Sequence, residues 1–370
     1  MVESQSRSGE SRGEASTLEG LVADGIEADL FTGAAAAVGT SEGIDWQTTA
    51  GVRDPRSEDP DPVTGETLFD AASTTKAVVT TTTILRLVEE GVLALSAPLS
   101  DYIPPLSGTE RGEIPLHRLM THTSGLQPYH YDEEWESPED ARQGVYDADL
   151  VEAEPGERFA YSCLNFVHLV DAARRATDRT LADLAREYVF EQAGMESARL
   201  GPLEEGAPPA AVTYEYEHAD SAFVGEIHDP IARAFAGESG NAGLFTTATD
   251  MGRFAAKLLD DRRDVAGSGP AAATDHLLAP GTIDRMTREW IPDLGRPHGL
   301  GWRLAQECYP APNWSLESFG HTGYTGASIW LDPEDDRFAV LLTNEVFCGK
   351  ENGMIQFRER FHGAVAGERY

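Results

Sequence analysis

DAASTTKAVV, residues 70–79, holds one of only three lysines in a chain of 370 residues. The other two are Lys257 and Lys350, and arginine supplies all the remaining basic side chains apart from histidine. A lysine kept in a chain that otherwise uses arginine indicates a task that arginine cannot perform. Lys76 is therefore the first candidate for a functional residue.

Ser73 lies three residues before Lys76. The pattern around them predicts a helix over 74–90 that ends at Gly91, although the four threonines at 80–83 are poor helix formers and need support from tertiary packing. On a helix, a spacing of three places both side chains on one face, with about 5 to 6 Å between their Cβ atoms. A capped helix with a surface lysine is the alternative interpretation of this pair.

The pair suggests nucleophilic chemistry. A serine hydroxyl is a weak nucleophile that needs a nearby base. At the start of a helix, Ser73 would have backbone N–H groups and the positive end of the helix dipole beside it, where they favour a developing negative oxygen. Lysine can act as the base if burial and neighbouring charges lower its pKa, whereas arginine stays protonated. We therefore expect Lys76 to have a lowered pKa.

The composition is strongly acidic. Sixty-three Asp and Glu residues against 29 Lys and Arg give a formal net charge of -34, while the hydrophobic fraction of 41% is ordinary for a globular protein. Such a surface repels nucleic acid and anionic membranes, so we expect neither as a partner. It also suits a protein that stays soluble in concentrated salt, which leads to the hypothesis of a salt-loving host. The alternative is a solvated surface with no specific cationic partner.

The sequence lacks several other signals. No apolar run reaches the roughly 18 residues of a membrane helix, and the polar segment 1–16 lacks the apolar core of a secretory signal. We therefore predict a cytoplasmic protein whose residues 1–16 form a disordered acidic tail. The three cysteines, Cys163, Cys308 and Cys348, are too widely spaced for a disulfide framework or a zinc site, so we expect no metal and no cofactor.

Apolar spacing predicts an α+β chain with strands at both ends. The expected elements are a helix over 18–30, strands over 34–38 and 44–50 joined by a hairpin turn, helices near residue 150 and over 165–176 and 181–192, a long surface loop over 203–223, strands over 327–331 and 337–344, and a helix over 352–365. Helix and strands at each end suggest that the two ends meet. The predicted organisation is a single domain over 17–367, with a sheet lobe (about 17–70 and 285–367) and a helical lobe (about 71–284).

Two further motifs follow the Ser-x-x-Lys pair. PGERFAYSCLNFVHL, residues 155–169, places Tyr161 between a turn and a helix, and FGHTGYTGASIW, residues 319–330, places His321, Thr322 and Gly323 at the start of a predicted strand. This order of motifs resembles the serine β-lactamase and penicillin-binding-protein superfamily. The similar branch contains class C β-lactamases, D,D-carboxypeptidases and β-lactamase-like esterases. Residues 91–104, 119–126 and 240–255 also resemble connecting segments of that family.

The resemblance implies a β-lactamase-like fold, in which an antiparallel sheet is flanked by N- and C-terminal helices and the active site lies in the cleft beside a mostly helical lobe. It implies that Ser73 attacks the substrate carbonyl and becomes acylated, while Lys76 and Tyr161 share the proton transfer; which of the two is the base stays open. The implied oxyanion hole is formed by the backbone N–H groups of Ser73 and Tyr324. The implied substrate-binding residues are His321, Thr322, Gly323 and Cys163.

Two positions depart from the family pattern. Cys163 stands where the family often has an asparagine that contacts the lysine and the substrate amide, and a thiol is a poor donor there. His321 replaces the lysine of Lys-Thr-Gly and, being mostly neutral at pH 7, offers less charge to a substrate carboxylate. Both changes favour a small-molecule ester or small amide as the substrate of a serine hydrolase. The alternatives are a D-amino-acid peptidase or β-lactamase, and a catalytically silent penicillin-binding-like module; the oligomeric state stays open.

Other polar residues have two interpretations. Cys163 is either a reactive thiol or, as we favour, a buried small hydrophobe. His122 and the pair His228 and Asp229 either line the cleft or, as we favour, fix loops by hydrogen bonding. Asn241 lies in a glycine-rich turn that either approaches the cleft or is only a tight turn.

Overall fold

The computed structural model describes residues 17–150, 153–214, 222–263, 276–306, 308–349 and 353–367. The predicted tail over 1–16 and the first residue of the predicted C-terminal helix, 352, lie outside these ranges. A six-stranded antiparallel sheet has the strand order β2-β1-β11-β10-β9-β8. Its strands are β1 (Gly33–Thr40), β2 (Gly43–Gly51), β8 (Arg303–Leu304), β9 (Phe319–Thr322), β10 (Ser328–Asp332) and β11 (Arg337–Thr343).

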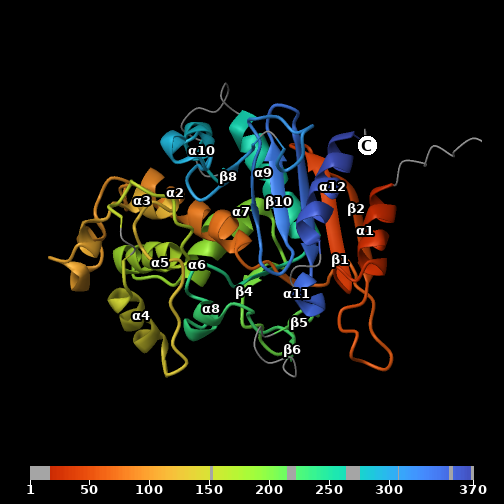
Figure 1. Cartoon of the computed structure of the whole chain (residues 1–370), viewed down its shortest axis with the longest axis horizontal. Coiled ribbons are helices and arrows are strands. Elements are labelled where there is room, and N and C mark those ends of the chain that lie inside the picture. Colours follow the sequence, from red (N-terminus) through yellow and green to blue (C-terminus); the bar gives the residue numbers. More distant parts are fainter. Residues whose placement is uncertain are drawn as a thin grey trace, which may run out of the picture.

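The two ends of the chain meet in this sheet, as predicted from the strand patterns. β1 pairs with β2 on one side and with β11 on the other, so that Ala34 lies opposite Thr343. The helices α1 (Leu18–Glu27) and α12 (Met354–Gly367) lie side by side at one face of the sheet (Figure 1). The α1 start is fixed by Thr17, whose Oγ1 accepts a hydrogen bond from the Gly20 N–H at 3.2 Å.

Small side chains let helices approach both faces of β1. Successive residues of a strand point to opposite faces. Ala34 and Ala36 belong to the apolar cluster with α1 and α12, whereas Ala35 and Ala37 belong to the main core, which also contains α9 (Ala248–Arg263). Gly252 of α9 keeps the approach close. This double cover explains why β1 is buried along nearly its whole length.

The remaining helices include those of the helical part at the left of Figure 1. They are η1 (Lys76–Thr81), α2 (Thr82–Glu89), η2 (Leu99–Asp101), η3 (Pro104–Leu106), η4 (Arg111–Glu113), α3 (Leu116–Met120), α4 (Pro138–Asp147), α5 (Leu164–Thr177), α6 (Leu181–Ala185), η5 (Arg186–Phe190), α7 (Glu191–Ala193), α8 (Pro230–Ala234), α10 (Pro280–Thr287), η6 (Pro292–Leu294) and α11 (Glu345–Cys348). α9 falls inside the range predicted as the helical lobe, yet it packs on the sheet. The sheet part therefore also draws on residues from the middle of the chain.

A small second sheet joins the two parts. It has the order β3-β7-β4, with β3 (Phe69–Asp70), β7 (Leu244–Thr246) and β4 (Arg199–Leu200). The Ala71 N–H donates to the carbonyl oxygen of Leu244 at 2.8 Å. This pairing brings the segment before Ser73 beside the segment that contains Asn241.

The prediction of a surface loop over 203–223 is wrong in its middle. Residues 210–213 are buried, and Leu68 forms an isolated parallel bridge with Ala210. Short strands follow at β5 (Thr213–Tyr214) and β6 (Ala222–Phe223), and 215–221 lie outside the described residues. Two-residue strands are too short to show a period, so sequence spacing could not reveal them.

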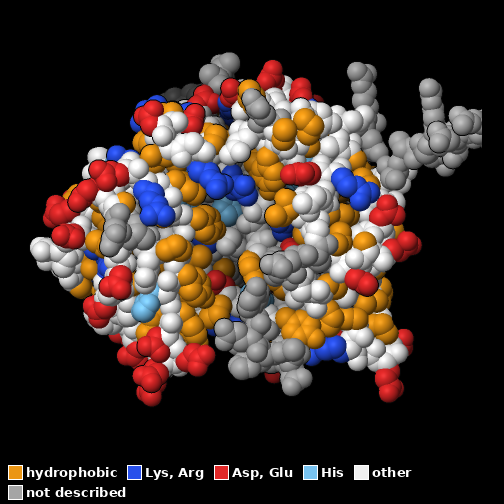
Figure 2. All heavy atoms as spheres, viewed as in Figure 1, with side chains coloured by type: hydrophobic (Ala, Val, Ile, Leu, Met, Phe, Trp, Pro, Cys, Tyr) orange, Lys and Arg blue, Asp and Glu red, His pale blue; other side chains and the backbone are white. Residues whose placement is uncertain are grey.

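Acidic side chains are scattered over the face of the molecule in Figure 2 and do not gather in a single patch. In the described parts of the chain, no helix is long and apolar enough to cross a bilayer. The association of this surface with a salt-loving host stays a prediction.

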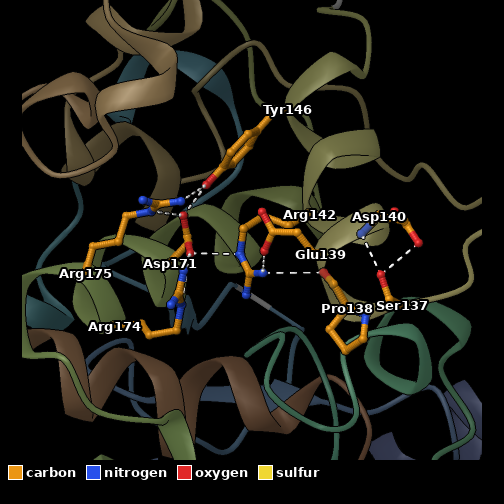
Figure 3. Close-up of polar contacts among 9 residues, drawn as sticks. All are labelled: Ser137, Pro138, Glu139, Asp140, Arg142, Tyr146, Asp171, Arg174 and Arg175. Carbon is orange, nitrogen blue, oxygen red and sulfur yellow. Dashed lines mark hydrogen bonds and ion pairs between the residues drawn. The ribbon is translucent and has the colours of Figure 1, made fainter.

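A buried ion-pair network fixes α4 to α5 (Figure 3). Asp171 of α5, whose side chain is 3% exposed, accepts hydrogen bonds from the Nε atoms of Arg142 and Arg175 at 2.9 and 2.8 Å. Arg174 and the hydroxyl of Tyr146 also donate to it. Although burial alone would raise the pKa of Asp171, hydrogen bonds from Tyr146 and the arginines lower it to about 2. The network holds the helix that directly follows Tyr161.

Replacing Asp171 with Asn should lower the free energy of unfolding at pH 7 by about 3 kcal/mol, because three arginines lose a buried anionic partner. An unfolded Asp has a pKa near 3.9, above the folded value of about 2. The contribution of the ionised carboxylate is therefore complete above about pH 5 and is lost as the pH falls toward 2. The difference in free energy of unfolding between wild type and Asp171→Asn, measured by urea unfolding, should shrink as the pH falls from 6 to 3.

Asp24→Asn is the control, since Asp24 is 52% exposed and lies 3.8 Å from Arg360. The Asp24→Asn change should lower the free energy of unfolding by less than about 0.5 kcal/mol. Equal losses in both variants, or a loss in Asp171→Asn that does not change with pH, would contradict the prediction.

Candidate active site

Ser73 lies in a turn that is held by a buried carboxylate. Asp70 at the end of β3 accepts hydrogen bonds from the backbone N–H groups of Ala72 and His228, each at 2.8 Å. Burial raises the pKa of Asp70 to about 6. Ala72 has a φ of +46°, a left-handed conformation that is uncommon for alanine, so the turn before Ser73 is held by its surroundings.

Lys76 points at Ser73, as the spacing of three predicts. Its side chain is fully buried, and Nζ donates to Ser73 Oγ at 3.0 Å and to the carbonyl oxygen of Asn241 at 2.7 Å. Residues 76–81 form a π-helical turn, and α2 continues the helix to Glu89. The four threonines at 80–83 are all buried, so packing does override their low helix propensity.

The expected lowering of the Lys76 pKa is wrong. Burial disfavours the charged ammonium, but the interactions of Lys76 with Cys163, Tyr161 and Asp229 outweigh burial and raise the pKa. The aromatic ring of Tyr161 adds to the stabilisation, since its centroid lies 5.2 Å from Nζ. Lys76 is therefore a charged group at neutral pH.

Tyr161 and Cys163 enter the site from the start of α5. Tyr161 is 36% exposed and lines a cavity together with Ser73. Cys163 is buried at the N-cap of α5, and burial raises the pKa of its thiol. Cys163 is not among the residues that line this cavity, which agrees with the interpretation of a buried small hydrophobe. All three cysteines are free thiols.

His122 fixes the segment that carries Tyr161. It is fully buried, and its Nδ1 accepts hydrogen bonds from the Ser162 N–H and from Asn165 Nδ2, both at 3.1 Å. Its ring lies against the ring of Tyr161, with 4.4 Å between centroids. These contacts agree with the loop-fixing interpretation of His122.

The cavity at Ser73 has a volume of about 580 Å³. Thr322, Gly323 and Tyr324 line it from the sheet side, and α12 contributes the apolar Met354 and Ile355 together with the polar Gln356 and Arg358. Thr322 is the last residue of β9, so the His-Thr-Gly motif ends a strand and does not start one, contrary to expectation. A Cβ on Gly323 would lie 2.5 Å from the carbonyl oxygen of Ala71, so glycine allows the strand end to approach the Ser73 turn.

His321 lies behind Thr322 and away from the Ser73 cavity. It is buried and lines a second cavity of about 200 Å³ that also touches Tyr161 and Thr322. Its Nδ1 and the carbonyl oxygen of Thr322 are 2.9 Å apart. Burial, together with the charges of Lys76 and Arg303, lowers the His321 pKa well below its usual value. The imidazole is neutral, in line with the expectation from sequence.

The second cavity contains two arginines that sequence reasoning missed. Arg296 and Arg303 line it together with Phe159 and His298, and Arg303 Nη1 donates to Thr322 Oγ1 at 3.3 Å. Figure 2 shows Lys or Arg side chains beside a histidine near the centre of the face, where the helical part meets the sheet. Nothing in the segment GWRL, residues 301–304, signals this proximity, because it arises from the pairing of β8 with β9.

His228, Asp229 and Asn241 also lie at the site. The His228 ring stacks on Tyr324 with 5.3 Å between centroids. Asp229 Oδ1 accepts a hydrogen bond from Asn241 Nδ2 at 3.0 Å, and Asn241 in turn accepts from Lys76. Within the residues that the structure covers, no group of three or more His, Cys, Asp or Glu side chains is placed to hold a metal ion.

Comparison with known proteins places this geometry in a family. The Beta-lactamase family model matches residues 18–354. A putative D-alanyl-D-alanine carboxypeptidase of Escherichia coli (strain K12) is 26% identical over 324 residues, which cover 78% of this chain and 71% of that protein.

Solved structures share the fold. EstCE1, described as a hydrolase with promiscuous acyltransferase activity, superposes with a TM-score of 0.75 at 20% identity and covers 95% of this chain and 97% of its own. The octameric penicillin-binding protein homologue from Pyrococcus abyssi superposes with a TM-score of 0.73 at 19% identity, over 94% of this chain and 76% of its own. With a family match over most of its length and this fold, the chain belongs to the β-lactamase family, within the serine β-lactamase and penicillin-binding-protein superfamily.

Proposed function

We propose that this protein is a serine hydrolase that cleaves carboxylic esters or small amides through an acyl-enzyme on Ser73. One observation carries the proposal: Ser73 Oγ lies 3.0 Å from the Nζ of a fully buried lysine and lines a cavity of about 580 Å³ that Tyr161 also lines. The cavity is large enough for a small substrate.

We assign the role of base to Tyr161. Lys76 is charged and donates its proton toward Ser73 Oγ, so it cannot accept the Ser73 proton at the same time. As the base, Tyr161 acts in its phenolate form and takes the proton as Ser73 attacks the carbonyl carbon, with the Lys76 Nζ 5.2 Å from the centroid of its ring. Tyr161 then returns the proton to the leaving group, and water releases the acyl group from Ser73. The backbone N–H groups of Ser73 and Tyr324 are the proposed donors to the oxyanion.

Two residues near Ser73 favour ester substrates. His321 is neutral and lies outside the Ser73 cavity, and Cys163 supplies no amide for a β-lactam or peptide. These two residues argue against an efficient β-lactamase. A silent binding module is disfavoured because Ser73, Lys76 and Tyr161 are all in place around one cavity.

A D-amino-acid carboxypeptidase is the second candidate. In the family motif, a lysine at the position of His321 supplies a positive charge beside the threonine. Here Arg303 brings a positive charge to Thr322. A leaving group with a carboxylate could bind between Thr322 and Arg303 in the cavity of about 200 Å³. The names of curated relatives, putative D-alanyl-D-alanine carboxypeptidases, support this alternative.

Ser73→Ala should abolish hydrolysis of p-nitrophenyl butyrate, because no other hydroxyl replaces the nucleophile. Intact-protein mass spectrometry after rapid quenching should detect a butyryl adduct on the wild type and none on the variant. Ser107→Ala, at an exposed turn, is the control and should keep full activity. Ester hydrolysis that survives in Ser73→Ala would contradict the proposal.

Arg303→Gln should separate the two candidates. We expect kcat/KM for an acyl-D-alanyl-D-alanine substrate to fall about tenfold or more, because a charge-assisted hydrogen bond to the carboxylate is lost. Hydrolysis of neutral p-nitrophenyl butyrate should change less than about twofold. Arg288→Gln is the matched control, since Arg288 stacks on Trp290 and does not line the cavity.

Comparing the two substrates on the wild type decides between an esterase and a carboxypeptidase. A wild type that hydrolyses the ester but not the D,D-dipeptide would eliminate the carboxypeptidase. Equal losses on both substrates in Arg303→Gln would contradict a carboxylate-binding role for Arg303.

A further inference from the structure

Residues 227–241 dock on the turn that carries Ser73 and on the helix that follows it. The His228 N–H donates to Asp70 Oδ2 at 2.8 Å, at the turn before Ser73. Near the other end of the segment, Thr80 Oγ1 donates to the carbonyl oxygen of Gly240 at 2.8 Å. Lys76 donates to the next carbonyl, that of Asn241. The segment therefore contacts the turn, the lysine and the helix one turn further on.

Asp229 ties the two ends of this segment together. Its Oδ1 accepts from the Ala232 N–H at 2.9 Å, which caps α8, and from Asn241 Nδ2 at 3.0 Å. Asn241 is fully buried, so its backbone carbonyl is held in one orientation, toward Lys76. The Asp229 carboxylate thus anchors Asn241, whose carbonyl oxygen accepts a hydrogen bond from the Lys76 ammonium.

Five titratable groups face Lys76 besides Ser73. Tyr161 and Cys163 approach from the start of α5, Asp229 from α8, and His122 and His321 from their loop and strand. Burial keeps both imidazoles neutral, since it lowers the pKa of each, and burial also favours the neutral thiol. Asp229 is the one carboxylate among these groups, and its interaction with Lys76 favours the ammonium form.

We propose that Asp229 is a positioning residue of the active site: through Asn241 it holds the Lys76 ammonium against Ser73, and it supplies the countercharge for that ammonium. The consequence for catalysis rests on the proposed function of Ser73. The electrostatic interaction between Asp229 and Lys76 can be tested without turnover, because the chain contains only three lysines.

The test is a pH titration of protein labelled with ¹³C at the lysine ε-carbon, observed by NMR. The wild type should give three lysine signals, which Lys257→Arg and Lys350→Arg assign. The Lys76 signal should stay in the ammonium position above the usual lysine pKa of about 10.4. Asp229→Asn keeps an oxygen for the Ala232 and Asn241 hydrogen bonds and removes only the charge.

In Asp229→Asn the ammonium loses a favourable neighbouring charge, so Lys76 should release its proton at a pH about one unit lower or more. Glu238→Gln is the matched control. Glu238 lies in the same segment and accepts the backbone N–H groups of Leu181 and Ala182, away from Lys76. A Lys76 signal that titrates alike in wild type and Asp229→Asn, or shifts equally in Glu238→Gln, would overturn the proposal.

Kinetics separate this inference from the proposed function. The alkaline limb of kcat/KM for p-nitrophenyl butyrate should move to lower pH in Asp229→Asn, in step with the Lys76 titration. A wild type without ester hydrolysis would refute the proposed function, and the lysine titration would still decide the role of Asp229. A shifted titration with an unchanged pH profile would overturn the catalytic part of the inference.

Discussion

The ammonium of Lys76 is the constraint on which the site depends. A fully buried charge is costly unless hydrogen bonds and opposite charge surround it. Here those partners come from three parts of the chain: Ser73 on the preceding turn, Tyr161 at the start of α5 and the carbonyl of Asn241 beside β7. Satisfying one side chain therefore draws together segments that are up to 165 residues apart.

The elements with a clear period were predictable from sequence. Short strand-like and apolar runs identified β1, β2, β10 and β11, and the ends of the chain meet in the sheet as expected. The long helix α5 also follows its apolar spacing. Strands of two residues, such as β3 and β8, carry no period, so the small sheet that sets Ser73 beside Asn241 could not be foreseen.

The site was predictable only in its local part. A spacing of three residues is enough to place Lys76 on Ser73, because both belong to one helical turn. The pKa of Lys76 is raised by Cys163, Tyr161 and Asp229, which are distant in the sequence and reach the site through tertiary packing. Arg303 likewise reaches Thr322 through strand pairing. Sequence motifs reveal which residues react. They do not reveal as readily which residues set the charge of those residues.

The central position of β1 also governs when the protein can fold. Ala34 pairs with Thr343, so the strand formed from the first part of the chain needs a neighbour that is synthesised more than 300 residues later. Loop closure over such a distance is slow, and an unpaired strand edge stays exposed in the meantime. On the ribosome, the β1–β2 hairpin has to wait for nearly the whole chain. The dense acidic charge would then act before folding is complete, because repulsion between nascent chains limits their aggregation during that wait.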